Sequence, residues 1–464
     1  MTDDHSPTHG HSHGHSHDHS HAMAGGWQRW GSVPTLRAVA ALVAIAGVAT
    51  VVAFIALWPS GEGRDAAMDR ASQFGLVSER IAATVEEQVI APCSYSTPEN
   101  PQDCREITLT LDEGPEAGAV VVLPEVNLEF ESAIPDLSAG DAVILGYEPT
   151  TNTYLFADLD RRVPLAALFG LFALFVIGFG RLRGLLALVS MSFTVVVLIG
   201  FIAPAVLDGS PALPVAVVAA SAIAFVSLYV THGFSPITTV ALAGTLGALA
   251  MTLGLSWIFF ELTRITGVGT EEALILPFIA TEINLSSLLL GGAVIGTLGA
   301  LDDITVTQVA TVSELHDRRP DLSRAELFRS GIRVGREHIA STVNTLLLAY
   351  AGASMPLLLF FSTSDQGLDT VASAEIVALE IVRTLCGSMG LVAAAPITTA
   401  LAVLVVSGDH LADVDLDDPA LDDPHLPEDL EPDLGEAVPA EPEAADEPAE
   451  ISGASWDDFA PEET

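Results

Sequence analysis

The sequence predicts a polytopic α-helical membrane protein of about eight transmembrane helices, with a small extracytoplasmic β domain that is OB-like or barrel-like. Half of the 464 residues are hydrophobic and the mean hydropathy is +0.47, which is high for a soluble chain of this length. The formal net charge is nevertheless −42. Apolar and acidic residues must therefore be segregated along the chain, with the apolar ones gathered into runs that can cross a bilayer.

Eight apolar stretches are long enough, or nearly so, to span a membrane as helices. They are residues 38–58, 163–180, 185–207, 212–230, 236–260, 284–301, 339–361 and 386–407. The first is too long for a signal-peptide core and is followed by no small-residue cleavage site, which favours an uncleaved transmembrane anchor. The other seven predict a membrane domain over residues 163–407.

The distribution of arginine predicts the orientation. All 18 basic residues are Arg, and many lie in residues 1–37, in the turn 181–184 and in the loop 302–338. Eight spans place these three regions on the same side, which the positive-inside rule makes the cytoplasmic side. We therefore expect a bacterial plasma-membrane protein with both termini in the cytoplasm and residues 59–162 outside.

Residues 59–162 predict a β domain. Short runs rich in β-branched residues, separated by Gly, Pro, Asp and Asn, occupy 107–111, 120–123, 126–130, 142–146 and 154–159, and 81–89 is a candidate sixth strand. Cys93 and Cys104 flank a turn-rich segment. In an oxidising compartment they would form a disulfide, and two free thiols are the alternative. The domain shows no catalytic constellation, so we expect a sensor, lid or docking module.

Both terminal segments are of low complexity. Residues 1–37 predict a disordered cytoplasmic tail with a tract of imidazoles, which can bind zinc, nickel, copper or cobalt. The candidate metal ligands are His9, His11, His13, His15, His17, His19 and His21. The tract either binds metal physiologically or is a low-complexity segment without a metal role, and both interpretations stay open. No other cofactor is expected. Residues 408–464 are acidic and rich in Pro, which predicts a disordered cytoplasmic tail.

The sixth apolar stretch carries the sharpest pattern. Gly292, Gly296, Gly299 and Asp303 lie at i, i+4, i+7 and i+11, on one face of a helix. Small residues at this spacing predict close helix packing, here ending in a carboxylate near the cytoplasmic interface.

Ionisable residues near this point are candidates for a transport path, because charged groups at membrane depth are costly and mark ion paths or proton relays. The candidates are Asp302, Asp303, Glu337, His338, Asn344 and His232. Three alternatives stay open. The aspartates could lie in the headgroup zone, the polar residues of the seventh stretch could form a structural network, and His232 could cap the next helix.

The sequence also excludes several functions. It contains no nucleotide-binding loop, no Gly-x-Ser-x-Gly and no zinc-protease motif, so we expect no enzyme. Transport would use an ion gradient, a channel or another subunit. With 18 basic against 60 acidic residues, the chain cannot neutralise the phosphates of a nucleic acid.

Three segments resemble the YibE/F family of bacterial membrane proteins. They are residues 231–235 (THGFS), 296–308 (GTLGALDDITVTQ) and 335–350 (GREHIASTVNTLLLAY). The resemblance runs from about residue 80 to 407 and implies an outer β module followed by a multi-helix membrane domain. The Lys-free, acidic composition suggests an actinobacterial version. The resemblance carries over no activity and no catalytic residue.

Two functions of different classes follow from the sequence. The first is a secondary transporter or permease for a divalent metal cation, with efflux favoured because the His tract would gather ions at the cytoplasmic mouth. The second is a non-transporting envelope scaffold or sensor that recruits partners through the outer β domain and the acidic tail. The expected partners are the lipid bilayer and a divalent cation, with a second copy of the chain or an envelope protein as further candidates.

Overall fold

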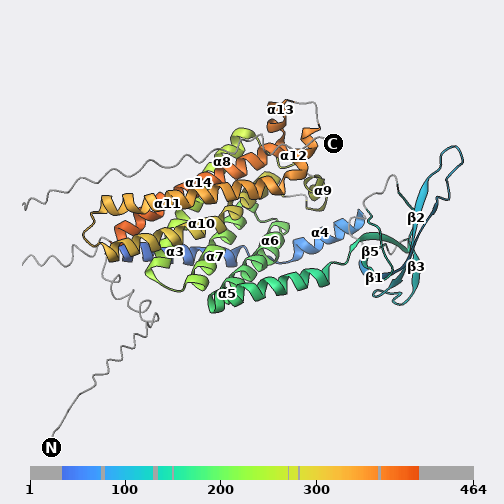
Figure 1. Cartoon of the computed structure of the whole chain (residues 1–464), viewed down its shortest axis with the longest axis horizontal. Helices are drawn as coiled ribbons and strands as arrows, with labels where there is room; N and C mark the ends of the chain where they lie inside the picture. The colour runs from blue at the N-terminus through green and yellow to red at the C-terminus, as the bar shows by residue number, and fades with distance from the viewer. Residues whose placement is uncertain are drawn as a thin grey trace, which may run out of the picture. The chain divides into compact units, whose positions relative to one another are not determined.

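The computed structural model describes residues 34–74, 79–128, 134–148, 151–269, 271–280, 283–363 and 367–406. The predicted imidazole ligands His9 to His21 and the acidic tail lie outside these residues. The described part consists of a helix bundle and an antiparallel β-sheet (Figure 1).

Long helices make up the bundle, and the short elements η1 and α6 continue the helical run of α5. They are α3 (Pro34–Ala56), α5 (Arg162–Val197), the π-helical turn η1 (Leu198–Ile202), α6 (Ala203–Leu207), α7 (Ala212–His232), α8 (Pro236–Thr263), α10 (Leu285–Arg318), α11 (Arg324–Ala353) and α14 (Glu375–Val406). Shorter helices connect them, namely α4 (Glu62–Gln73), α9 (Glu271–Ile279), α12 (Met355–Ser362) and α13 (Leu368–Ser373). The chain is therefore a multi-pass helical membrane protein, as the apolar runs predict.

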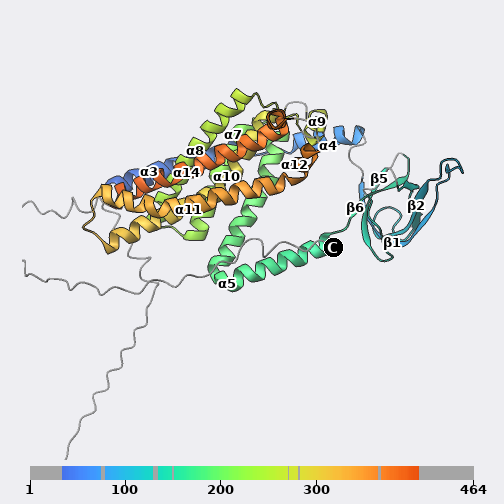
Figure 2. The ribbon, with the colours of Figure 1, turned by 45° about the horizontal axis from the view of Figure 1, so that its top comes forward.

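The number of crossings depends on how two bent helices are counted. Six helices among the described residues are long and apolar enough to cross a membrane, or seven if α11 and α12, bent by 63°, form one span. The predicted stretches 163–180 and 185–207 fall in one helical run, Arg162–Leu207. Arg181 interrupts that run with non-helical angles (φ 49°, ψ −127°), and Figure 2 shows the sharp bend in α5.

Polar side chains cap the N-termini of α8 and α11, the two helices that follow turns predicted to be cytoplasmic. Ser235 accepts a hydrogen bond from the backbone N–H of Thr238 and so caps α8. His232 is the last residue of α7, so the alternative that it caps the next helix is wrong. Ser323 and Glu326 form a capping box that begins α11.

The centre of the bundle is formed by α8, α10 and α14, which lie side by side (Figures 1 and 2). At two of these contacts, a glycine of one helix packs against a threonine side chain of another helix. A Cβ atom at Gly244 of α8 would lie 2.2 Å from Oγ1 of Thr398, and one at Gly390 of α14 would lie 1.8 Å from Oγ1 of Thr252. These contacts let the helices approach closely, as small residues do in membrane proteins.

The sheet contains six strands: β1 (Glu79–Pro92), β2 (Asp103–Leu111), β3 (Val120–Val122), β4 (Val126–Asn127), β5 (Ala142–Glu148) and β6 (Thr153–Leu159). Its order is β3-β2-β1-β5-β6, with β4 also paired to β2, and all pairs are antiparallel. The described strands contain no pairing between the edge strands β3 and β6, so hydrogen bonds do not close the sheet. It curls around a core of Ile81, Val85, Ile107, Leu109 and Leu145 (Figure 2).

The two cysteines of this sheet are joined. Cys93 at the end of β1 and Cys104 near the start of β2 form a disulfide across a sequence separation of 11 residues. Their register places Cys104 opposite Ala91 in the hairpin. The disulfide therefore closes the turn-rich segment between the two strands.

Candidate functional site around α10

Asp302 and Asp303 point in different directions from α10. Successive residues of a helix are turned by about 100°, so neighbouring side chains face different surroundings. Asp302 is half-buried, and its carboxylate interacts with the hydroxyls of Ser227 on α7 and Thr245 on α8. The side chain of Asp303 is 66% exposed. The two carboxylates therefore do not share one site.

Hydroxyl groups surround Asp302. Thr245 and Thr305 form a hydrogen bond of 2.7 Å between α8 and α10, and Thr305 also donates to the backbone carbonyl of Asp302 at 3.1 Å. The Oδ1 atom of Asp302 is buried and has no hydrogen-bond partner among the residues that the structure describes. A buried carboxylate oxygen without a partner is costly, so Asp302 is a candidate functional residue.

A second group lies at the end of α10 that faces α11. Nε2 of His338 lies 3.2 Å from Oδ2 of Asp303. His232 at the end of α7 is exposed and interacts with the charges of Arg183 and Asp303. The structure thus brings three predicted residues, His232, Asp303 and His338, to one accessible rim.

Two predicted residues stay apart from this rim. Glu337 and Asn344 are exposed on α11, and neither forms a described hydrogen bond or ion pair with Asp303 or His338. In the part of the chain that the structure describes, no three His, Cys, Asp or Glu side chains lie close enough together to hold a metal ion. The predicted candidates therefore divide between the Asp302 surroundings, the Asp303 rim and an exposed face of α11.

The predicted close packing along the glycine face of α10 is wrong. No neighbouring atom lies within 4 Å of a Cβ built at Gly292 or Gly299, and at Gly296 the nearest atom is Oη of Tyr350, 3.0 Å away. All three glycines are exposed. The close contacts of α10 instead use other residues, among them Gly291, whose Cβ would lie 2.5 Å from Cβ of Ala216. Spacing alone could not distinguish these two faces.

Sequence reasoning missed the buried threonines of α8 and α14. Thr239, Thr398 and Thr399 are each at most 4% exposed, and Thr399 donates a 2.9 Å hydrogen bond to the buried amide of Gln308. The signal that could have found them is a repeated tetrapeptide, Pro-Ile-Thr-Thr, at residues 236–239 and 396–399. The repeat places hydroxyls inside the bundle from both α8 and α14.

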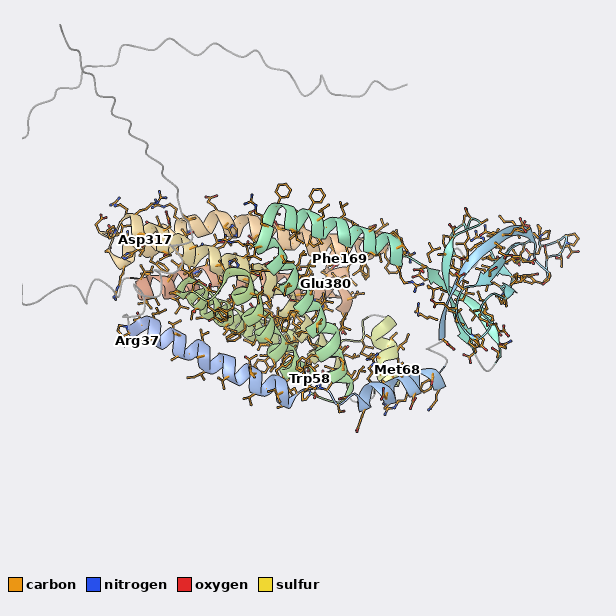
Figure 3. All side chains as sticks on the ribbon, turned by 90° about the horizontal axis from the view of Figure 1, so that it is seen from below. Arg37, Trp58, Met68, Phe169, Asp317 and Glu380 are labelled. Carbon is orange, nitrogen blue, oxygen red and sulfur yellow. A yellow bond between two sulfur atoms is a disulfide. The ribbon has the colours of Figure 1, made fainter. Side chains whose placement is uncertain are left out.

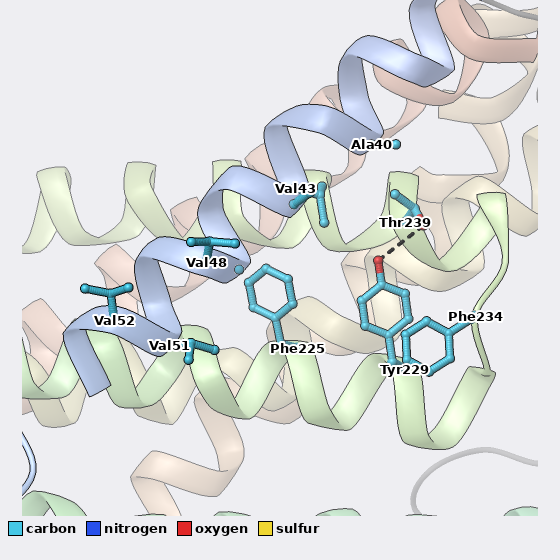
Figure 4. Close-up of a pocket in the computed structure, with 11 residues that line it drawn as sticks. Ala40, Val43, Val48, Val51, Val52, Phe225, Tyr229, Phe234 and Thr239 are labelled. Carbon is cyan, nitrogen blue, oxygen red and sulfur yellow. Dashed lines mark hydrogen bonds between the residues drawn. The ribbon is translucent and has the colours of Figure 1, made fainter. Parts of the chain in front are cut away.

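A separate groove lies between α3 and the helices α7 and α8 (Figure 4). It has a volume of about 450 Å³ and is lined by apolar side chains such as Val43, Val51 and Phe225. Its polar contact is the hydrogen bond of 3.2 Å between the hydroxyls of Tyr229 and Thr239. No carboxylate, imidazole or guanidinium lines it, so this groove does not offer an ion path.

The match to a known protein family falls on the helix bundle. A search of curated proteins finds no match, and a search of solved structures finds none. The family model described as YibE/F-like protein matches residues 168–408. This range covers more than half of the chain and contains α7, α8, α10, α11 and α14, while the β-sheet lies outside it. The chain belongs to the YibE/F-like protein family.

Proposed function

We propose that this protein is a secondary transporter that moves a divalent metal cation through the membrane bundle, with Asp302 as the charged residue of its path. The observation that supports this proposal is the buried, unpartnered Oδ1 atom of Asp302. Ionisable groups inside a membrane are costly to keep and occur on ion pathways. A carboxylate held only to fix the helices would instead have both oxygens hydrogen-bonded.

The rim formed by Asp303 and His338 serves as the entrance. Its imidazole–carboxylate pair is accessible. Asp303 is next to Asp302 on α10, so we place the rim at the mouth of the path that leads to Asp302. The predicted cytoplasmic His tract would raise the local concentration of metal ions at this side. Efflux is therefore the direction that we propose.

We further propose eight crossings of the bacterial plasma membrane, with both termini in the cytoplasm and an OB-like β domain outside. Figure 3 shows Arg37, at the start of α3, and Asp317, near the end of α10, at the same end of the bundle, with Trp58 at the other. This arrangement requires that α5 cross twice, before and after Arg181. The disulfide between Cys93 and Cys104 suits an oxidising compartment.

Total cell metal, measured by mass spectrometry, tests the transport proposal. We expect one metal to accumulate in a deletion strain and in an Asp302→Asn strain grown under graded manganese, zinc, cobalt and nickel. The matched control is Asp317→Asn, an exposed aspartate on the same helix, which should match the wild type at equal expression. Unchanged content of every metal in the deletion strain would overturn the proposal and favour the envelope scaffold.

A further inference from the structure

The atoms around Asp302 suggest which cations this site accepts. The hydroxyls of Ser227 and Thr245 interact with its carboxylate. The Thr305 hydroxyl forms hydrogen bonds with the Thr245 hydroxyl and with the backbone carbonyl of Asp302. Every candidate ligand atom is therefore oxygen. We infer that the Asp302 site binds a hard, oxygen-preferring divalent cation of the Mg²⁺ and Mn²⁺ class rather than zinc, nickel or cobalt. This inference rests on the transport proposal above.

Ligand chemistry supports this selectivity. Carboxylate, carbonyl and hydroxyl oxygens suit Mg²⁺, Ca²⁺ and Mn²⁺, whereas imidazole and thiolate suit zinc, nickel and copper. His232 and His338 interact with Asp303 on the rim, and among the described residues no imidazole interacts with Asp302. The free cysteine of the described residues, Cys386, is on α14 and belongs to a separate buried cluster. Soft ligands are thus kept away from the interior site.

One observation indicates a ligand position rather than a closed structural hydrogen-bond network. Oδ1 of Asp302 is buried but unpartnered, so one ligand position is open.

The charge and number of ligands also fit this class. One carboxylate cannot neutralise a divalent cation, and Asp303 faces His338 on the rim instead of this site, so a bound ion would keep part of its hydration water. Mg²⁺ and Mn²⁺ are commonly held by one or two carboxylates and retain several water molecules. A site with one carboxylate and a few hydroxyls matches a partly hydrated ion passing through better than a dehydrated ion in a closed cage.

Ion flux into proteoliposomes containing the purified full chain tests this inference. The probes are Mn²⁺, Zn²⁺ and Cd²⁺, each reported by a dye trapped inside the vesicles. We expect Mn²⁺ flux to exceed Zn²⁺ flux in the wild-type protein. Asp302→Asn should lower Mn²⁺ flux by about tenfold or more, because the site then has no carboxylate. Asp317→Asn is the control for the charge of α10.

A second variant keeps the test decisive if Asp302→Asn does not fold. Ser227→Cys replaces a hydroxyl with a thiol of similar shape, so it should fold while offering Cd²⁺ a soft ligand. We expect it to raise Cd²⁺ flux relative to Mn²⁺ flux by about tenfold, as a change of ligand commonly does at metal sites. The matched control is Ser221→Cys, six residues earlier on α7, where the hydroxyl donates a hydrogen bond to the backbone carbonyl of Val217.

The outcomes separate the two proposals. Absence of flux for every metal would refute the transport proposal itself. Flux of Zn²⁺ without Mn²⁺ would leave transport standing and overturn the oxygen-site inference. A folded Ser227→Cys protein with an unchanged ratio of Cd²⁺ to Mn²⁺ flux would also overturn it, because Ser227 would then not contact the ion.

Discussion

Replacing Asp208 by alanine should detach the helix that leads into the β-sheet. Asp208 lies in the turn between α6 and α7, and its carboxylate accepts hydrogen bonds from the first residues of the α4 segment. Gly63 donates its N–H at 2.8 Å and Gly61 at 3.1 Å, and Ser60 donates both its hydroxyl, at 2.8 Å, and its backbone N–H. Asp208 therefore caps α4 from a distant part of the chain.

The magnitude follows from these four hydrogen bonds. Three of the donors are backbone N–H groups around the first turn of α4, where a helix lacks internal acceptors. Each hydrogen bond contributes about 0.5–1.5 kcal/mol, and bonds to a charged acceptor are stronger. Because Asp208 is half-buried and water can replace part of the loss, we expect Asp208→Ala to destabilise the docked α4 by about 2–4 kcal/mol.

Hydrogen exchange of the full chain in detergent micelles, measured by mass spectrometry, tests this expectation. Local opening that is easier by about 2–4 kcal/mol should raise exchange in residues 60–74 by roughly 30- to 1,000-fold. The control is Asp69→Ala, an exposed position on α4 whose side chain has no described hydrogen bond. Exchange in residues 60–74 that rises no more in Asp208→Ala than in Asp69→Ala would refute the capping role.

The pH dependence of this contact follows from the pKa of Asp208. Burial raises the pKa, but the hydrogen bonds from Ser60, Gly61 and Gly63 together outweigh it and hold the pKa below its ordinary value. The contact therefore stabilises the docked helix at every pH above the ordinary carboxyl pKa of about 4. The stabilisation should fall only as the pH drops through the lowered pKa. A loss between pH 7 and 5 would contradict this assignment.

Two further predictions concern packing and the disulfide. Gly390→Ala should lower the melting temperature of the purified protein, because the new methyl group would overlap Thr252 and such overpacking costs about 1–3 kcal/mol. Gly254→Ala, with open space at its Cβ, should change the melting temperature little. Equal decreases in melting temperature for the two variants would contradict the packing argument. For the disulfide, Cys104→Ser should free Cys93 for labelling by a maleimide reagent without reductant. It should also destabilise the hairpin by about 3 kcal/mol, measured by hydrogen exchange, and a wild-type protein that reacts equally would show that the thiols are free.

Local sequence patterns predicted the helices and strands well, because each of these elements depends mainly on residues that are close in sequence. A run of about 20 apolar residues is sufficient to specify a spanning helix, and the predicted strands all have counterparts in the sheet, including the candidate sixth at 81–89 within β1. The disulfide pairing could also be proposed, since Cys93 and Cys104 are close in sequence and flank a turn. The YibE/F resemblance rested on continuous motifs and is confirmed by the family model.

The glycine pattern failed for a physical reason. Small residues at i, i+4 and i+7 permit close packing but do not require it, and only the direction of the neighbouring helices decides which face is covered. In the fold, α8 and α14 cover the face of α10 that carries Thr297 and Thr305, which leaves Gly292 and Gly299 uncovered. The same packing buries the repeated threonines, whose partners are up to 91 residues apart in sequence.

The sequence by itself determined the class of the protein, its apolar spans, its strands and the set of ionisable residues near the sixth span. Only the tertiary structure decided how that set divides. Adjacent positions on a helix face different neighbours, so Asp302 turns to the hydroxyls of α7 and α8 while Asp303 turns to His338 on α11. The separation of an oxygen-lined interior from a histidine-bearing rim depends on contacts between helices, because no local pattern records which helix lies beside which.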